Sequence, residues 1–144
     1  MFKRVLLCYD SSIAGRRALK RGAELAILFD AEVFVLSVLS EAASNAEFLA
    51  NAVGTISLTN YQSEYQLSLD ECLHWLRTRG VSARGRLVRG DTLEAIVTYA
   101  TQTSSDLVVV GHYPTPAGGR WWTNSGGTSL AERLNCCVLI AVSD

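Results

Sequence analysis

The chain has 144 residues, a mass of 15.6 kDa and a formal net charge of −1 at neutral pH. With 49% hydrophobic and 19% charged residues, its composition argues against intrinsic disorder. The length predicts a single domain over residues 1–144. The near-zero net charge argues against a nucleic-acid binder. No apolar run reaches the roughly 20 residues of a membrane span, so we expect no membrane partner.

Strand-like and helix-like segments alternate along the chain. Strands are indicated by short apolar or β-branched runs, and helices by apolar residues at helical spacing. Capping side chains at 10–12 precede the first predicted helix, and Gly80 follows the second. The predicted strands are 2–9, 31–39, 83–88, 106–111 and 136–142, and the predicted helices are 13–29, 57–79, one that begins at Asp91, and 127–134.

Three local features of this pattern carry their own expectations. Asp91 and Glu94 fit a capping box, in which each side chain accepts a hydrogen bond from the other's backbone amide, and Ser129 with Glu132 fits a second one. Residues 40–54 have no clear period, and both a short helix and a mobile connection fit them. Tyr61 and Tyr65 are expected in the core and not in a ligand site.

This order of elements predicts an α/β fold. Continuous apolar strands joined by helices are typical of a parallel sheet that is covered by helices on both faces. Right-handed crossovers then make a doubly wound sheet the simplest arrangement. In such a sheet ligands bind beyond the carboxyl ends of the strands, which directs attention to residues 8–10, to Val38 and Leu39, and to the segment from Gly111 onward.

The cysteines and the N-terminal residues indicate the compartment. The four cysteines (residues 8, 72, 136 and 137) form no CxxC pair, and His74 and His112 lie far from paired cysteines, so no zinc site is expected. Buried thiols in a reducing cytosol are the expected state. The N-terminus lacks the long apolar stretch and cleavage site of a signal peptide, so a cytoplasmic location is expected.

The segment after the fourth predicted strand is rich in candidate binding residues. From Gly111 to Ser129 it holds both prolines and no carboxylate. Residues 124–129 carry small and hydroxyl side chains directly before a helix, whose amino end favours an anion, and Arg120 adds a cation. A phosphate site and an ordinary helix cap both fit. Trp121 and Trp122 are adjacent, so one of them is expected to cover a ligand, a partner or a dimer seam.

Asp10, at the end of the first predicted strand, has two interpretations. Its carboxylate fits a hydrogen bond to a ribose hydroxyl or a base amino group, and it equally fits the N-cap of the first helix. No nucleophile–base pair, Walker A motif, GxSxG elbow or pair of metal carboxylates occurs, so we expect no catalytic residue. The absence of GxGxxG after the first strand disfavours classical NAD binding.

Several segments taken together resemble the universal stress protein family. The resemblance covers the whole chain and implies a doubly wound, five-stranded parallel sheet of order 3-2-1-4-5, which is adenine-nucleotide alpha-hydrolase-like. The segments that carry it are 4–12 with Ala18 and Leu19, 35–38, Gly90 and Asp91 before Ile96 and Ala100, and 106–111.

One branch of that family binds ATP and another does not. The binding branch carries the motif Gly, two residues, Gly, nine residues, then Gly and Ser or Thr. Counted from Gly111, the second glycine falls on Pro114, the third on Asn124 and the hydroxyl on Ser125. Pro114 has no amide to donate, whereas Asn124 tolerates a left-handed conformation.

The resemblance implies a site for ATP or AMP, with or without Mg²⁺. In it Asp10 would meet adenine or ribose, Val38 would contact the base through its backbone, and nearby glycines could replace the missing motif glycines. The implied binding residues are Cys8, Tyr9, Asp10, Val38, Val110, Gly111, Pro114, Asn124, Ser125, Gly126 and Gly127.

Two function classes follow. The first is a nucleotide-binding regulatory module of a stress response, with at most very slow ATP hydrolysis. The second is a dimeric interaction module without a ligand, whose output is an unidentified partner protein. A homodimer is expected through the uncharged strand Cys136–Val142, because it lies at a sheet edge, whereas arginines between Arg84 and Arg89 blunt the opposite edge.

Overall fold

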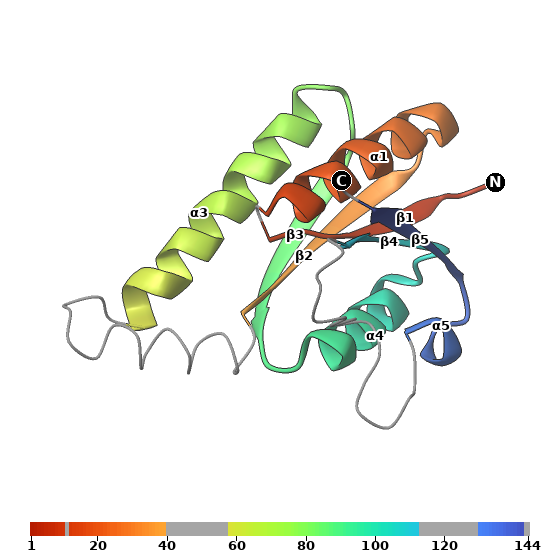
Figure 1. Cartoon of the computed structure of the whole chain (residues 1–144). Coiled ribbons are helices and arrows are strands. Elements are labelled where there is room, and N and C mark those ends of the chain that lie inside the picture. Colours follow the sequence, from red (N-terminus) through yellow and green to blue (C-terminus); the bar gives the residue numbers. More distant parts are fainter. Residues whose placement is uncertain (11, 40–57, 113–129, 143–144) are drawn as a thin grey trace.

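A computed structural model gives the structure of the chain and describes residues 1–10, 12–39, 58–112 and 130–142. Within these residues strands and helices alternate as the sequence predicts (Figure 1). The first helix has the predicted bounds, and the other elements differ by a few residues at their ends. The elements are β1 Arg4–Cys8, α1 Ile13–Phe29, β2 Glu32–Leu39, α3 Leu58–Arg77, β3 Ala83–Arg89, α4 Thr92–Thr103, β4 Leu107–His112, α5 Leu130–Arg133 and β5 Cys137–Val142.

The five strands form one parallel sheet of order β3-β2-β1-β4-β5. The predicted fold class and strand order are thereby confirmed. From β1 the chain first builds outward through β2 and β3, and then returns to the other side of β1 through β4 and β5. The strand order therefore reverses between β1 and β4, which is the position at which open α/β sheets bind ligands.

Helices cover both faces of the sheet, with α1 and α3 on one face and α4 and α5 on the other (Figure 1). Alternate residues of β1 serve the two layers, because successive side chains of a strand point to opposite faces. Val5 and Leu7 pack into the α1–α3 core, and Leu6 packs into the α4–α5 core; all three are fully buried. Burial of each such side chain contributes about 1.5–3 kcal/mol.

The capping box predicted at the start of α4 is only half formed. Asp91 is the N-cap, and its carboxylate accepts a hydrogen bond of 2.9 Å from the backbone amide of Glu94. The carboxylate of Glu94 does not reach back to Asp91 and instead pairs with the guanidinium of Arg133, with Nη2 to Oε2 at 2.9 Å. A two-pronged guanidinium–carboxylate pair is stronger than a bond to one amide, and the hydrogen bonds from Arg133 lower the pKa of Glu94.

The expectation of buried thiols is confirmed for Cys72 and wrong for Cys137. Cys72 is buried on α3, Cys8 and Cys136 are half-buried, and Cys137 is exposed. Cys137 is the first residue of an edge strand, where one side of the backbone has no neighbouring strand to cover it. An apolar run in the sequence therefore did not guarantee burial at this position.

Thiol reactivity should follow this difference in exposure. We expect a maleimide or disulfide reagent at pH 8 to modify Cys137 well before Cys72, because burial raises the pKa of Cys72 to about 12 and leaves almost no thiolate there. Mass spectrometry of tryptic peptides over a time course measures the order, and denaturant should make all four cysteines react. Modification of Cys72 as fast as that of Cys137 would contradict the arrangement.

Some sequence expectations fall outside the described residues. These include the ambiguous stretch 40–54 and Ser129 of the second capping box. The helices in the described ranges do not combine the length and the hydropathy that crossing a membrane would take. The cytoplasmic location stays a prediction. In the same ranges no cluster of histidine, cysteine and carboxylate side chains has the make-up of a metal site.

Candidate functional site

The candidate site lies at the carboxyl edge of β1, β2 and β4. Cys8 stands opposite Leu36 of β2, and Leu7 stands opposite Val109 of β4. Continuing this register by two residues carries Asp10 to the level of Val38. Some of the predicted binding residues belong to the part of the chain that the structure describes. They come from three segments far apart in the chain, and they lie together at one edge of the sheet.

Asp10 is exposed at the end of β1, and it is not the helix cap. The N-cap of α1 is Ser12, whose hydroxyl accepts a hydrogen bond of 3.0 Å from the amide of Gly15. Asp10 in turn accepts hydrogen bonds through Oδ1 from the amide of Ser12, at 3.0 Å, and from its hydroxyl, at 2.5 Å. Among the described residues no donor reaches Oδ2 of Asp10, so this oxygen is available to a ligand.

Gly15 is a site residue that the sequence analysis missed. A Cβ at this position would collide with Oδ1 of Asp10. The glycine therefore makes room for the carboxylate beside the first turn of α1. A glycine in the first turn of a helix, where it costs helix stability, directly after a carboxylate and a capping serine, is the signal that could have pointed to it.

Gly111 has a steric role that the motif count alone did not reveal. A Cβ on Gly111 would collide with the carbonyl oxygen of Ala14 and crowd the amide nitrogen of Gly15. The end of β4 and the first turn of α1 thus approach each other backbone to backbone. This close packing sets the distance between the end of β4 and the carboxylate of Asp10, which Gly15 adjoins.

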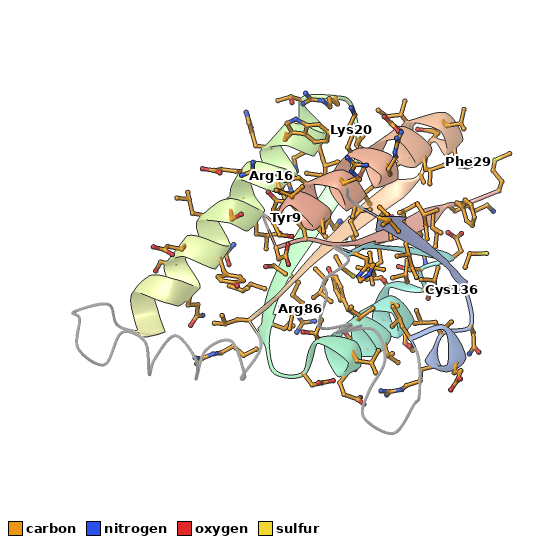
Figure 2. The ribbon with its side chains drawn as sticks, viewed as in Figure 1. Tyr9, Arg16, Lys20, Phe29, Arg86 and Cys136 are labelled. Carbon is orange, nitrogen blue, oxygen red and sulfur yellow. The ribbon has the colours of Figure 1, made fainter. Side chains whose placement is uncertain are left out.

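The remaining predicted residues of β1, β2 and β4 divide between the two faces. Cys8 and Val38 are half-buried and pack against the α4–α5 core, and Val110 is fully buried in it. Tyr9 is half-buried against the α1–α3 core, so its side chain lies on the opposite face from Cys8 (Figure 2). Val110 therefore supports the site from within the α4–α5 core, and the side chain of Tyr9 packs on the face away from Cys8 and Val38.

Cys8 is not set up as a nucleophile. Its burial, and next to that the negative charge of Asp10, raise the pKa of the thiol above its ordinary value. The reactive form of cysteine is the thiolate, which this environment disfavours. At neutral pH the side chain of Cys8 therefore acts as a small apolar wall of the site.

The phosphate half of the predicted site falls outside the described residues. Pro114, Asn124, Ser125, Gly126 and Gly127 belong to the range 113–129, as do Trp121 and Trp122. The described site therefore consists of the ends of β1, β2 and β4 and the first turn of α1.

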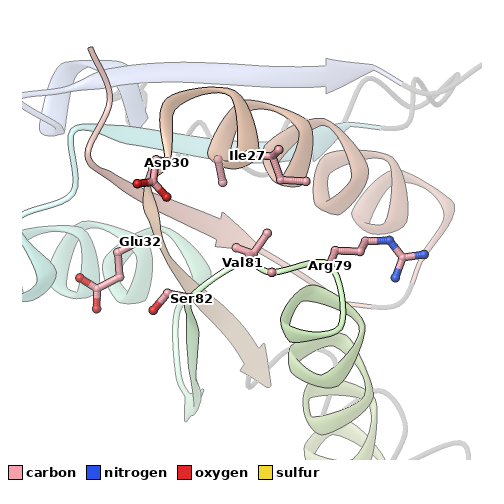
Figure 3. A pocket seen from close by; sticks show the side chains of 9 residues that line it. Ile27, Asp30, Glu32, Arg79, Val81 and Ser82 are labelled. Carbon is pink, nitrogen blue, oxygen red and sulfur yellow. The ribbon is translucent and has the colours of Figure 1, made fainter.

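A cavity of about 500 Å³ lies at the other end of the sheet (Figure 3). It is bordered by the end of α1, the start of β2 and the turn between α3 and β3. Two of its charged groups already have partners: Arg79 stacks on Trp75 at 3.8 Å, and Glu32 faces Arg84 at 3.6 Å. It adjoins the amino ends of the strands, so it is separate from the candidate site.

Comparison with known proteins decides the family. A model of the universal stress protein family matches residues 1–141. The chain belongs to the universal stress protein family. Comparison with curated protein sequences gave no match. The predicted single domain over 1–144 stays a prediction, although the family match covers nearly all of it.

Three solved structures resemble the chain over nearly their whole lengths. Hypothetical protein MJ0577, whose biochemical function was assigned from its structure, has a TM-score of 0.71 at 20% identity, and the match covers 100% of this chain and 98% of that one. A universal stress protein in complex with cAMP has a TM-score of 0.68 at 19% identity, covering 96% of each chain. A family protein from Arabidopsis thaliana with AMP bound has a TM-score of 0.66 at 14% identity, covering 99% and 92%.

At these identities the likeness establishes the fold. It confirms the adenine-nucleotide alpha-hydrolase-like arrangement that the resemblance implied. In this universal stress protein the strand order reverses between β1 and β4, which is the position at which open α/β sheets bind ligands.

Proposed function

We propose that this universal stress protein binds an adenine nucleotide, AMP or ATP with or without Mg²⁺, at the edge formed by β1, β2 and β4. It then acts as a regulatory module of a stress response and not as an enzyme with rapid turnover. The observation that carries the proposal is the exposed carboxylate of Asp10, with Oδ2 open among the described residues, at the reversal point of the strand order. Two structural relatives with cAMP or AMP bound support it.

The described residues suit the nucleoside half of the ligand. Oδ2 of Asp10 would accept a hydrogen bond from a ribose hydroxyl, the bond type that a carboxylate at this edge makes well. The side chains of Cys8 and Val38 would form an apolar wall, and the backbone at Val38 would contact the base. The phosphates would extend toward residues 124–127, where the sequence concentrates small and hydroxyl side chains.

Calorimetric titration tests this proposal. Addition of AMP or ATP to the full chain, with and without Mg²⁺, should give saturable heat, and the nucleotide should raise the melting temperature. At a ligand concentration about 100 times the dissociation constant, the expected stabilisation is about 2.7 kcal/mol. If millimolar nucleotide gives no heat and no thermal shift, the proposal is wrong, and the alternative function, an interaction module without a ligand, remains.

We propose a second activity, homodimer formation through β5, on a separate observation. β5 is an edge strand, and its large apolar residues Ile140 and Val142 are 40% and 51% exposed in the single chain. Apolar side chains beside an unpaired strand edge favour pairing with another chain. Antiparallel pairing of β5 with its twofold mate would cover these side chains and close the assembly.

Charge and proline on β5 should prevent dimer formation. The double variant Val138→Lys/Ile140→Pro is expected to give monomers or insoluble protein, because it adds charge to the paired edge and removes a backbone donor. Ile27→Lys, at another exposed apolar position on α1, is the control and should leave the dimer intact. Sedimentation velocity measures the state, and a wild-type chain that is monomeric at high micromolar concentration would refute the dimer.

A further inference from the structure

The other edge of the sheet, β3, has a row of backbone groups that find no partner among the described residues. The amide of Val33 donates to the carbonyl of Ser82 at 2.8 Å, and the amide of Gly90 donates to the carbonyl of Leu39 at 3.2 Å. In a parallel ladder every second residue bonds one neighbouring strand. The register of β2 and β3 is continuous. The backbone amides and carbonyls of the even-numbered residues of β3 therefore point toward β2, and those of the odd-numbered residues point away from the sheet.

Within the part of the chain that the structure describes, the outward groups are open over the second half of β3. The carbonyl of Ala83 is occupied, because Nε and Nη2 of Arg77 donate to it at 3.1 and 2.8 Å. Among the described residues no donor or acceptor is recorded for the outward backbone of Gly85, Leu87 and Arg89. These residues leave three amides and three carbonyls at the spacing of an extended chain.

Two arginines flank this open edge on the side of α4. Arg84 and Arg86 stand opposite Phe34 and Leu36, whose side chains belong to the α4–α5 core, so all four lie on that face. The side chain of Arg84 is 75% exposed and lies 3.6 Å from Glu32, and Arg86 bonds, of the residues described, only the neutral side chain of Gln102, at 3.2 Å. Arg86 therefore keeps its charge for a partner, and the largely exposed ion pair with Glu32 holds the guanidinium of Arg84 only weakly. Residues two apart on a strand are about 6.6–6.8 Å apart.

A groove of about 270 Å³ runs between β3 and α4 beside these arginines. Val88, Ala95 and the ring of Tyr99 give it an apolar floor. Its two carboxylates are engaged, since Asp91 caps α4 and Glu94 pairs with Arg133, whereas Arg86 and Arg89 add positive charge. Burial raises the pKa of Tyr99 despite the opposing effect of Arg86 and Arg84, so its phenol stays protonated and can donate a hydrogen bond.

We propose that the edge of β3 is a docking surface for an extended segment of a partner protein that carries carboxylates at alternate positions. The segment adds a strand to the sheet, with its backbone bonded to Gly85, Leu87 and Arg89. Its alternate side chains fall on the α4 face, where carboxylates meet Arg84 and Arg86 and an apolar residue meets Val88. Main-chain bonds supply affinity in this mode and side-chain pockets supply specificity.

The charges select an acidic segment over a second copy of this chain. Pairing two β3 strands would bring arginines toward one another across the new ladder, and like charges opposite each other destabilise a strand pair. An acidic partner turns the same positions into opposite-charge pairs. The inference concerns the edge far from β4 and does not depend on nucleotide binding.

A synthetic peptide tests the docking surface directly. The acetylated peptide Val-Thr-Glu-Thr-Glu-Thr-Val presents two glutamates on one face and an apolar residue beyond them in either strand direction. Titrated without nucleotide into the isotope-labelled full chain, it should shift and protect the amides of Gly85, Leu87 and Arg89, and binding should weaken with salt. A peptide of the same composition with adjacent glutamates, Val-Thr-Glu-Glu-Thr-Thr-Val, should bind more weakly, because one carboxylate then faces away from the arginines.

Two variant pairs separate the charge and backbone contributions. The double variant Arg84→Glu/Arg86→Glu should lower the affinity for the peptide with alternating glutamates by about tenfold or more, since two attractive cross-strand pairs become repulsive. Arg16→Glu/Lys20→Glu on α1 changes the net charge equally and should have little effect (Figure 2). Arg89→Pro should bind more weakly than Arg89→Ala, because only the proline removes an outward amide.

The folded state of each variant is checked by circular dichroism, and Arg84→Lys/Arg86→Lys provides a charge-conserving reference that should keep most of the binding. Equal affinity of the two glutamate peptides, or of wild type and the Arg84→Glu/Arg86→Glu variant, would overturn the proposal. So would shifts confined to β5, or no binding of the alternating peptide at millimolar concentration.

Discussion

Replacing Gly111 by valine should lower the free energy of unfolding by about 1–3 kcal/mol and remove nucleotide binding, because overpacking a close contact costs about that much. The added Cβ would meet the carbonyl oxygen of Ala14, which is backbone and cannot rotate away. The first turn of α1 would have to move, and Gly15, which adjoins the carboxylate of Asp10, would move with it. Urea unfolding measures the stability, and calorimetry measures the affinity for AMP.

Gly80→Asn is the control for this substitution. Gly80 has a φ of 78° and no atom within 4 Å of a built Cβ, and asparagine tolerates the left-handed conformation. We expect this variant to keep the wild-type affinity and most of the stability. A Gly111→Val protein with the unfolding midpoint and affinity of the wild type would show that the contact between β4 and α1 does not shape the site.

Replacing Asp10 by alanine should weaken nucleotide binding about ten- to a hundredfold. Loss of a hydrogen bond to a charged group costs about 1.5–3 kcal/mol, and each factor of ten in affinity corresponds to about 1.4 kcal/mol. Asp10 is exposed, and its hydrogen bonds to described residues go only to Ser12, so the effect on unfolding should be much smaller than the effect on binding. Calorimetric titration of AMP into both proteins measures the ratio.

Asp70→Ala removes the same charge from an exposed position on α3, where the carboxylate bonds only Gln66 among the described residues. This variant should bind AMP as the wild type does. If the Asp10 and Asp70 variants bind with equal affinity, the carboxylate at the end of β1 is not a ligand contact.

Local patterns predicted the elements well, because they depend on neighbours in the sequence. The bounds of α1 follow from capping residues before Ile13 and from the helical spacing of its apolar residues. The strand order was implied by the family resemblance and is confirmed by the pairing of the strands. The sequence could not tell that Glu94 turns away from its capping box, because its partner Arg133 lies 39 residues further along the chain.

The site was predicted in part for the same reason. Asp10, Val38 and Gly111 follow or end apolar strands, and parallel strands bring such residues to one edge. The role of Gly15 depends on where the carboxylate of Asp10 lies in space, which no local pattern specifies. Exposure of Cys137 likewise depends on what lies beyond β5, so a run of apolar letters could not reveal it.

Chemical-shift mapping with AMP tests the central claim most directly. In the isotope-labelled full chain, saturating AMP should move the amides of Asp10, Gly15, Val38 and Gly111, while those of Glu32, Gly80 and Val81 at the opposite end of the sheet stay in place. This result would locate the nucleotide at the carboxyl edge of β1, β2 and β4. An unchanged spectrum at millimolar AMP, or shifts confined to the cavity beside Glu32 and Gly80, would contradict the account.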